Sequence, residues 1–115
     1  MRRPELIPEI EKLGIDFVDV ESPELSKHIQ IATRGMPISL GLDAVGNPGT
    51  TTIASVLSPG AHLVSYAGLS VLPIHVPQGD LIAKRLTIHG FWMYCKEYLS
   101  IIRAALIEAT KAVAS

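Results

Sequence analysis

Residues 38–68, ISLGLDAVGNPGTTTIASVLSPGAHLVSYAG, are the stretch that decides the fold. Residues 38–42 form a short apolar run, and the Gly, Asn, Pro and Gly of residues 46–49 force the backbone to turn. Residues 50–57 carry apolar side chains at the spacing of one helix face, and a Ser-Pro-Gly stop follows them. Residues 62–66 are a second apolar run. The stretch therefore predicts two buried parallel strands joined by a helix, and both strands end at the same edge of a sheet.

The chain on either side of this unit continues the alternation of helix and strand. Before it, prolines and acidic residues at two helix starts predict two helices with a short strand, FVDV, between them. After it come a short helical piece, the strand LTIHGF and the longest helical pattern of the chain. The expected helices cover residues 4–13, 23–34, 80–84 and 95–114, and the expected strands cover residues 17–20 and 86–91. This order predicts an α/β fold with a mostly parallel sheet.

The composition indicates one globular domain. The chain has 115 residues, of which 48% are hydrophobic and 18% are charged, so it can bury a core. Its net charge of −1 gives no indication of nucleic-acid or membrane-surface binding. The apolar runs are too short to span a membrane, and no signal peptide is visible. Because Cys95 is the only cysteine, no internal disulfide is possible, and we expect a reducing, cytoplasmic setting.

Asp43 follows the first strand of the central unit, and two interpretations of it are open. A carboxylate at a strand end could accept a phosphoryl group, as in response-regulator receivers. Those domains also need acidic residues near the first strand and a lysine after a later one, and the chain lacks that set. We therefore favour a turn-forming Asp43 that caps the backbone of Val45 or Gly46.

Histidine and tyrosine residues give no catalytic or metal-ligating pattern. No two of the histidines lie three or four residues apart, and none lies near Cys95 in a ligand pattern, so we expect them to be structural or surface residues. Tyr94 is followed four residues later by Tyr98 rather than by lysine, which excludes the short-chain dehydrogenase pattern. The four histidines are His28, His62, His75 and His89. No catalytic residue and no metal ligand is assigned.

Glycines and arginines carry more information. Gly46 and Gly68 follow strands and Gly90 lies within one, and glycine at a strand end lets a flat ligand approach the backbone closely. Plain turn glycines are the alternative at each position. Arg2 and Arg3 precede the first helix and could bind a phosphate there, although a solvated pair is the simpler interpretation.

Four segments together resemble the cofactor domain of the medium-chain dehydrogenase/reductase superfamily. They begin RRPE at residue 2, LDAVG at residue 42, GAHLVSYAGL at residue 60 and LTIHGFW at residue 86. The resemblance is strongest to the zinc-independent branch of quinone reductases and trans-2-enoyl-CoA reductases, in which Gly-Phe-Trp after the last strand is typical of the enoyl reductases. It implies a partial Rossmann-type sheet, the cofactor NADPH, and hydride transfer to an enoyl thioester, an enone or a quinone.

The resemblance also implies which residues contact the cofactor. Arginines in the position of Arg2 and Arg3 contact the 2′-phosphate of NADPH in this family. The turn after the first strand of the central unit would border the nicotinamide ribose, and the segments after the next two strands would line the nicotinamide end. The implied cofactor-binding residues are Arg2, Arg3, Ala44, Val45, Gly46, Tyr66, Ala67, Gly68, Leu69, Phe91, Trp92, Met93 and Tyr94.

Compared with this family, the chain lacks the substrate-binding domain, the first two Rossmann strands and the Gly-rich pyrophosphate turn. Three strands would then form a sheet, with an exposed edge at residues 38–42. We expect the strand at residues 17–20 to move across to that edge, another chain to pair there, or the sequence to be part of a larger polypeptide. The whole chain, residues 1–115, is thus interpreted as part of an NADPH-dependent oxidoreductase, inactive alone. The alternative is a non-enzymatic α/β module. In either case we expect a homodimer through residues 86–91, from Leu86 to Phe91.

Overall fold

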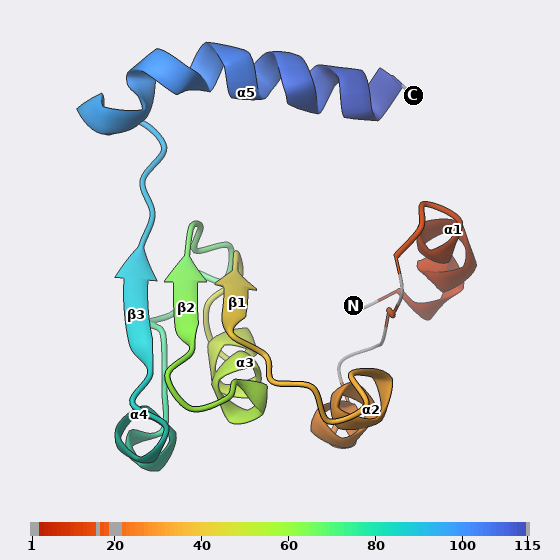
Figure 1. Cartoon of the computed structure of the whole chain (residues 1–115), viewed down its shortest axis with the longest axis vertical. Helices are drawn as coiled ribbons and strands as arrows, with labels where there is room; N and C mark the ends of the chain where they lie inside the picture. Colours follow the sequence, from red (N-terminus) through yellow and green to blue (C-terminus); the bar gives the residue numbers. More distant parts are fainter. Residues whose placement is uncertain (1–2, 16, 19–21, 115) are drawn as a thin grey trace.

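A computed structural model of the chain describes residues 3–15, 17–18 and 22–114. Helices and strands alternate through most of this range, as the sequence predicts (Figure 1). The elements are η1 (Pro4–Leu6), α1 (Ile7–Glu11), α2 (Leu25–Ala32), β1 (Leu40–Asp43), α3 (Gly49–Val56), β2 (His62–Ser65), α4 (Gln78–Ala83), β3 (Thr87–Gly90) and α5 (Lys96–Ala114). Most boundaries lie within one or two residues of the predicted ones.

The three strands form one parallel sheet in the order β1-β2-β3. Gly41 pairs with Leu63, and Leu63 pairs with Ile88, so these three residues share one row across the sheet. Right-handed crossovers in this order place α3 and α4 on the same face, and the two helices contact each other. The predicted partial Rossmann sheet, an α/β fold with three parallel strands, is confirmed.

The core lies between this face and the two crossover helices. Its buried members are small or aliphatic: Ala54, Leu57, Ala61, Leu63 and Leu86. Gly41 allows α3 to approach β1 closely, because a Cβ atom at this position would lie 2.4 Å from Cγ2 of Ile53. The opposite face of the sheet is open. Its residues Leu40 and Leu42 are 53% and 60% exposed, whereas parallel sheets are normally covered on both faces. Among the described residues, the crossover helices α3 and α4 pack on one face of the sheet, so the helices on both faces expected of a doubly wound sheet are not observed.

The N-terminal part of the chain lies to one side of the sheet, with α2 against α3 (Figure 1). The predicted helix from Pro4 is a 3₁₀ turn followed by α1, and Pro8 lies in the first turn of α1, where its missing N–H is tolerated. The predicted strand at residues 17–20 is not observed at Phe17 or Val18, and the rest of it lies outside the described residues. In the described part of the chain no segment pairs with the free edge of β1.

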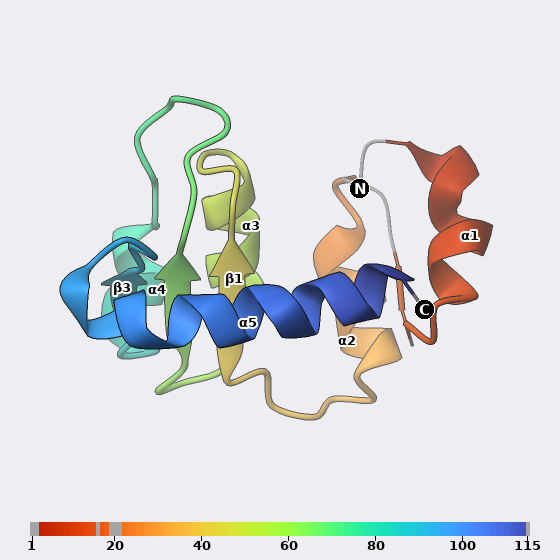
Figure 2. The ribbon, with the colours of Figure 1, turned by 90° about the horizontal axis from the view of Figure 1, so that it is seen from above.

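The longest helix, α5, stands beyond the carboxyl ends of the strands. Figures 1 and 2 show it running from the β3 side of the sheet towards the side on which α1 and α2 lie. Several of its apolar residues are exposed, with Ile101 at 58% and Leu106 at 57%. Its start is fixed by an aromatic contact, since the rings of Phe91 and Tyr98 lie 5.0 Å apart. Within the described residues, no helix is both long enough and apolar enough to cross a membrane.

Candidate functional site

The turn after β1 is built around the carboxylate of Asp43, which is only 2% exposed. Its Oδ1 atom accepts hydrogen bonds from the backbone N–H groups of Val45 and Gly46, at 2.9 and 3.0 Å. Its Oδ2 atom accepts a hydrogen bond of 2.5 Å from the hydroxyl of Thr50, which lies in the first turn of α3. Both carboxylate oxygens therefore accept hydrogen bonds that stabilise the turn, as the turn-forming interpretation predicts. The carboxylate is not exposed to solvent as a phosphoacceptor would be.

The turn after β1 is joined to the segment that leaves β2. The backbone N–H of Leu69 donates to the carbonyl of Ala44 at 3.1 Å, and the N–H of Ser70 donates to the carbonyl of Val45 at 2.9 Å. Gly46 has a φ of +87°, and a Cβ atom there would lie 2.9 Å from Oγ of Ser70. A glycine at this position thus satisfies both the backbone conformation and the close approach. The structure brings the turn residues and the segment from Tyr66 to Leu69 together.

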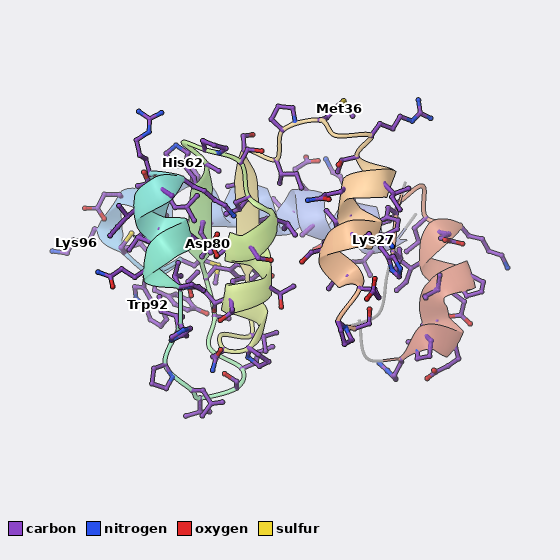
Figure 3. The ribbon with its side chains drawn as sticks, turned by 90° about the horizontal axis from the view of Figure 1, so that it is seen from below. Lys27, Met36, His62, Asp80, Trp92 and Lys96 are labelled. Atoms are coloured by element: carbon purple, nitrogen blue, oxygen red, sulfur yellow. The ribbon has the colours of Figure 1, made fainter. Side chains whose placement is uncertain are left out.

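The segment that leaves β3 starts at the same edge of the sheet. The N–H of Phe91 donates to the carbonyl of Ser65 at 2.9 Å, which places Phe91 beside the end of β2. Trp92, which is labelled in Figure 3, and Tyr94 come next in the chain, and both are exposed. The centroids of their rings lie 5.3 Å apart. The segments after β2 and β3 therefore start side by side at the same edge of the sheet.

A cavity of about 360 Å³ opens beside the turn after β1, between the end of the strand and α3. Its volume lies within the range of small-molecule sites, roughly 300–1,000 Å³. It is lined by Leu25, Leu42, Asp43, Ala44, Val45, Pro48, Gly49, Thr52, Ile53 and Tyr66. Most of these groups are apolar, so the cavity suits the flat or apolar part of a ligand, with backbone groups of the turn as the polar contacts.

Not every predicted site residue lies at this cavity. Ala44, Val45 and Tyr66 line it, whereas Phe91 and Met93 line a separate apolar cavity of about 350 Å³ with α5 residues between Tyr98 and Ala109. Arg3 is exposed before η1 and does not line either cavity, and Arg2 lies outside the described residues. The structure thus divides the predicted site residues that line a cavity between two separate cavities, and it places Arg3 at neither.

Sequence reasoning missed several lining residues that come from helices. Leu25 belongs to the start of α2, and Thr52 and Ile53 belong to α3. The run of three threonines after the Gly-Asn-Pro-Gly turn was the available signal, because hydroxyl residues at a helix start often bind the preceding turn. Leu25 gave no signal, since its place beside the turn depends on how α2 packs against α3.

Two ionisable groups near the start of α5 have shifted pKa values. Desolvation raises the pKa of the Cys95 thiol, and its hydrogen bond with the Glu97 carboxylate and that negative charge raise it further. The pKa of Glu97 is lowered, chiefly by a hydrogen bond from its own backbone N–H and then by the Cys95 thiol. Cys95 is therefore not an activated thiolate nucleophile. Among the residues that the structure describes, no group of three or more His, Cys, Asp or Glu side chains could hold a metal ion.

The chain is similar in sequence to mitochondrial enoyl-[acyl-carrier-protein] reductases. It is 34% identical to the Caenorhabditis elegans protein over 89 residues, which cover 77% of this chain and 25% of that protein. It is 38% identical over 56 residues to the NADPH quinone oxidoreductase of Kluyveromyces marxianus, covering 49% of this chain and 15% of that protein. No protein-family model matches the chain. The names of the enoyl reductases place those proteins in mitochondria, so the cytoplasmic expectation stays a prediction.

Solved structures of the same kind share the fold. A mutant of Etr1p in complex with NADP and crotonyl-CoA superposes with a TM-score of 0.75 at 27% identity, covering 96% of this chain and 34% of that one. The mitochondrial 2-enoyl thioester reductase heterodimer Etr1p/Etr2p of Candida tropicalis gives 0.72 at 26% identity, covering 96% and 32%. The chain spans about a quarter of the length of the curated enoyl reductases it matches, 25% for the Caenorhabditis elegans protein.

Proposed function

We propose that this chain, which belongs to the enoyl- and quinone-reductase branch of the medium-chain dehydrogenase/reductase superfamily, supplies the later part of an NADPH-binding domain. The observation that carries the proposal is that the segments after all three strands start at one edge of the sheet. The N–H of Leu69 binds the carbonyl of Ala44, and the N–H of Phe91 binds the carbonyl of Ser65 at the end of β2. Ligands of open parallel sheets bind at this edge. Residues 1–115 are interpreted as part of that domain, and the substrate domain would belong to the rest of a longer protein.

The described residues fit the nicotinamide half of such a cofactor. Ala44 and Val45 of the turn line the cavity, and their side chains are short enough for a ribose to lie against them. Gly46 is buried against Ser70 and Leu72 and supports the turn from behind. Tyr66 borders the same cavity and is 51% exposed, which leaves its ring free to pack on a flat group. The segments from Tyr66 to Leu69 and from Phe91 to Tyr94 would then lie around the nicotinamide ring.

NADPH supplies a hydride, and we propose that the intact protein transfers it to the double bond of an enoyl thioester, to an enone or to a quinone. In that reaction this chain binds and orients the cofactor and excludes water with its apolar cavity lining. We assign no catalytic residue to the chain. The chain alone should therefore bind NADPH without catalysing turnover.

Trp92 provides a direct test, because it is the single tryptophan of the chain and lies within a proposed cofactor segment. Reduced nicotinamide bound nearby should quench Trp92 emission by energy transfer. The substitution Ala44→Leu fills the cavity and should weaken NADPH binding by about 10-fold, the effect of roughly 1.4 kcal/mol of lost contacts. The same change at exposed Ala83 in α4, Ala83→Leu, is the matched control and should leave binding unchanged.

Three results would contradict the proposal. If NADPH does not quench Trp92, or if Ala44→Leu and Ala83→Leu bind it equally well, the cavity is not the cofactor site. If the purified chain reduces crotonyl-CoA with NADPH at an enzyme-like rate, it contains a catalytic group that we do not assign. A separate titration with NADH tests the arginine pair, since Arg3→Gln should reduce the preference for NADPH over NADH if Arg3 contacts the 2′-phosphate.

The second candidate function is that of a non-enzymatic module that dimerises through its edge strand. It rests on a different observation, the free edge of β3. The N–H groups of Thr87 and Phe91 point to β2, so those of Ile88 and Gly90 point to the free edge, where a second copy could pair. One solved relative is described as a heterodimer. A charge at Ile88 would be a poor test, because Ile88 packs against the core. Gly90→Pro removes an outward N–H instead, and sedimentation should show a dimer that this change disrupts; a persistent dimer would exclude pairing at this edge.

A further inference from the structure

His62 and His89 form a pair on the open face of the sheet. His62, labelled in Figure 3, begins β2, and His89 lies on the neighbouring strand β3. Nδ1 of His62 and Nε2 of His89 lie 2.9 Å apart, and the two rings are stacked with centroids 5.2 Å apart. Both side chains are exposed. They are separated by 27 positions in sequence, so it is the parallel pairing of β2 with β3 that brings them together.

We propose that His62 and His89 are a two-imidazole binding site for a divalent transition-metal ion, with water in the other coordination positions. Imidazole nitrogen lies about 2.0–2.1 Å from such an ion, so two nitrogens at right angles around it are about 2.9 Å apart. The two facing nitrogens already have this separation. Because both rings are exposed, they can rotate so that their lone pairs converge on the ion.

The proton count is consistent with metal binding by two neutral rings. In the free pair one of the facing nitrogens donates its N–H to the other. When an ion binds, the ring that donated this hydrogen bond moves its proton to its other nitrogen, which points away from the partner ring. Each ring then offers one lone pair to the ion and keeps one N–H. The metal-bound pair then has its protons on Nε2 of His62 and Nδ1 of His89, where water can accept them.

Coordination chemistry favours Cu²⁺ over Zn²⁺ at this site. Imidazole is a good ligand for both ions, and Cu²⁺ stands highest in the affinity order of divalent first-row metals. A closed structural zinc site would need four protein ligands, and the described residues offer no third His, Cys, Asp or Glu that would complete a group with this pair. The site is therefore open and partly filled by water.

An ion held this way connects two adjacent strands of the folded chain. In the unfolded chain the two histidines are far apart on average, so the ion binds the native state preferentially and raises its stability. The effect requires both rings. A single histidine would bind an ion weakly and without this preference, because the second ring acts at a high effective concentration once the first is bound.

The test is a titration of the chain with Cu²⁺, with electron paramagnetic resonance to count equatorial imidazoles and thermal unfolding to measure stabilisation. We expect one tightly bound ion with two imidazoles and a higher unfolding temperature. His62→Gln and His89→Gln should each leave one imidazole, weaken binding by roughly 10-fold or more and abolish the stabilisation. His75→Gln, at an exposed histidine of the loop before α4, is the matched control and should behave as the unchanged chain. Circular dichroism verifies that each variant is folded.

Three results would overturn the proposal. The first is a chain that binds Cu²⁺ through one imidazole or none. The second is a pair of variants, His62→Gln and His89→Gln, that are stabilised by Cu²⁺ as much as the unchanged chain. The third is a loss of binding in His75→Gln equal to that in either variant, which would place the ion elsewhere. NADPH binding is measured separately and does not enter any of these outcomes.

Discussion

Thr50 donates its hydroxyl to Oδ2 of Asp43 at 2.5 Å, and this hydrogen bond joins the end of β1 to the first turn of α3. Both residues are fully or almost fully buried, at 0% and 2% exposure. A hydrogen bond to a charged acceptor is stronger than one between neutral groups. A buried carboxylate oxygen that loses its donor is left without a hydrogen bond, and this lowers the stability of the folded state. The bond therefore holds the turn at the candidate site in place.

We expect Thr50→Val to destabilise the chain by about 1–3 kcal/mol, because it removes the donor and leaves the Asp43 oxygen unsatisfied. Thr50→Ser keeps the hydroxyl, so it should lower the free energy of unfolding by less than Thr50→Val does. Urea unfolding measures both, and Thr87→Val, at an exposed strand position, should change the unfolding free energy by no more than about 0.5 kcal/mol. Equal stability of Thr50→Val and Thr87→Val would mean that the hydrogen bond contributes nothing.

The contact between Gly41 and Ile53 gives a second prediction. A Cβ atom at Gly41 would lie 2.4 Å from Cγ2 of Ile53, so α3 would have to move away from β1. We expect Gly41→Ala to cost about 1–3 kcal/mol of unfolding free energy, the usual effect of overpacking a core. Gly79→Ala in α4 meets nothing within 4 Å and should be neutral or stabilising by up to about 1 kcal/mol.

A double variant separates the steric conflict from other effects of the alanine. Ile53→Ala removes Cγ2, so combining it with Gly41→Ala should cost less than the sum of the two single changes. The coupling expected for residues in direct contact is about 0.5–3 kcal/mol. Strict additivity in urea unfolding would show that the two residues do not compete for the same space.

The local elements of the central unit were predictable because each has a complete signal within a few residues. The boundaries of β1, α3 and β2 were predicted to within about two residues at each end. The signals were the GNPG turn, the spacing of apolar residues in α3 and the two apolar runs. Asp43 was also predictable, because a short acidic side chain at a strand end commonly accepts the N–H groups two and three residues later. The three-stranded sheet with an exposed edge at residues 38–42 was what the resemblance to a Rossmann-type domain implies, and the order β1-β2-β3 agrees with it.

The parts that depend on distant packing were not predictable in the same way. The strand expected at Phe17 and Val18 does not form there, because an apolar run needs a partner strand, and no described strand pairs at that side of the sheet. Leu25 lines the cavity only because α2 packs on α3. His62 and His89 looked unrelated in sequence, and only the register of β2 and β3 brings them together.

Gly46 and Gly60 form a matched pair for a third prediction. Both have positive φ angles, +87° and +80°, but a Cβ atom would meet nothing within 4 Å at Gly60, whereas at Gly46 it would lie 2.9 Å from Ser70 Oγ and 3.3 Å from the Leu72 carbonyl. Alanine should cost about 1–2 kcal/mol at Gly60 from backbone conformation alone. It should cost more at Gly46, where a steric conflict is added.

The pair also tests the candidate site. Gly46→Ala displaces the turn beside the cavity, so it should weaken NADPH binding measured through Trp92, while Gly60→Ala should leave it unchanged. The titrations are made at a temperature at which circular dichroism shows both variants folded. If Gly60→Ala weakens NADPH binding as much as Gly46→Ala, general destabilisation rather than the turn controls binding.

The last prediction concerns the pH dependence of Cys95. Desolvation and the neighbouring Glu97 carboxylate raise the pKa of the thiol, so at a given pH less of it is thiolate than in a free cysteine. Because the thiolate is the species that reacts with alkylating reagents, the rate of Cys95 alkylation should reach half its maximum at a higher pH than for a cysteine-containing peptide. Glu97→Gln removes the negative charge, so this midpoint should move down, and part of the shift should remain because desolvation is the larger cause. Glu108→Gln changes the same type of side chain near the other end of α5, where Glu108 pairs with Lys111, and should not move the midpoint. A midpoint that does not respond to Glu97→Gln would exclude the carboxylate as a cause and leave desolvation alone.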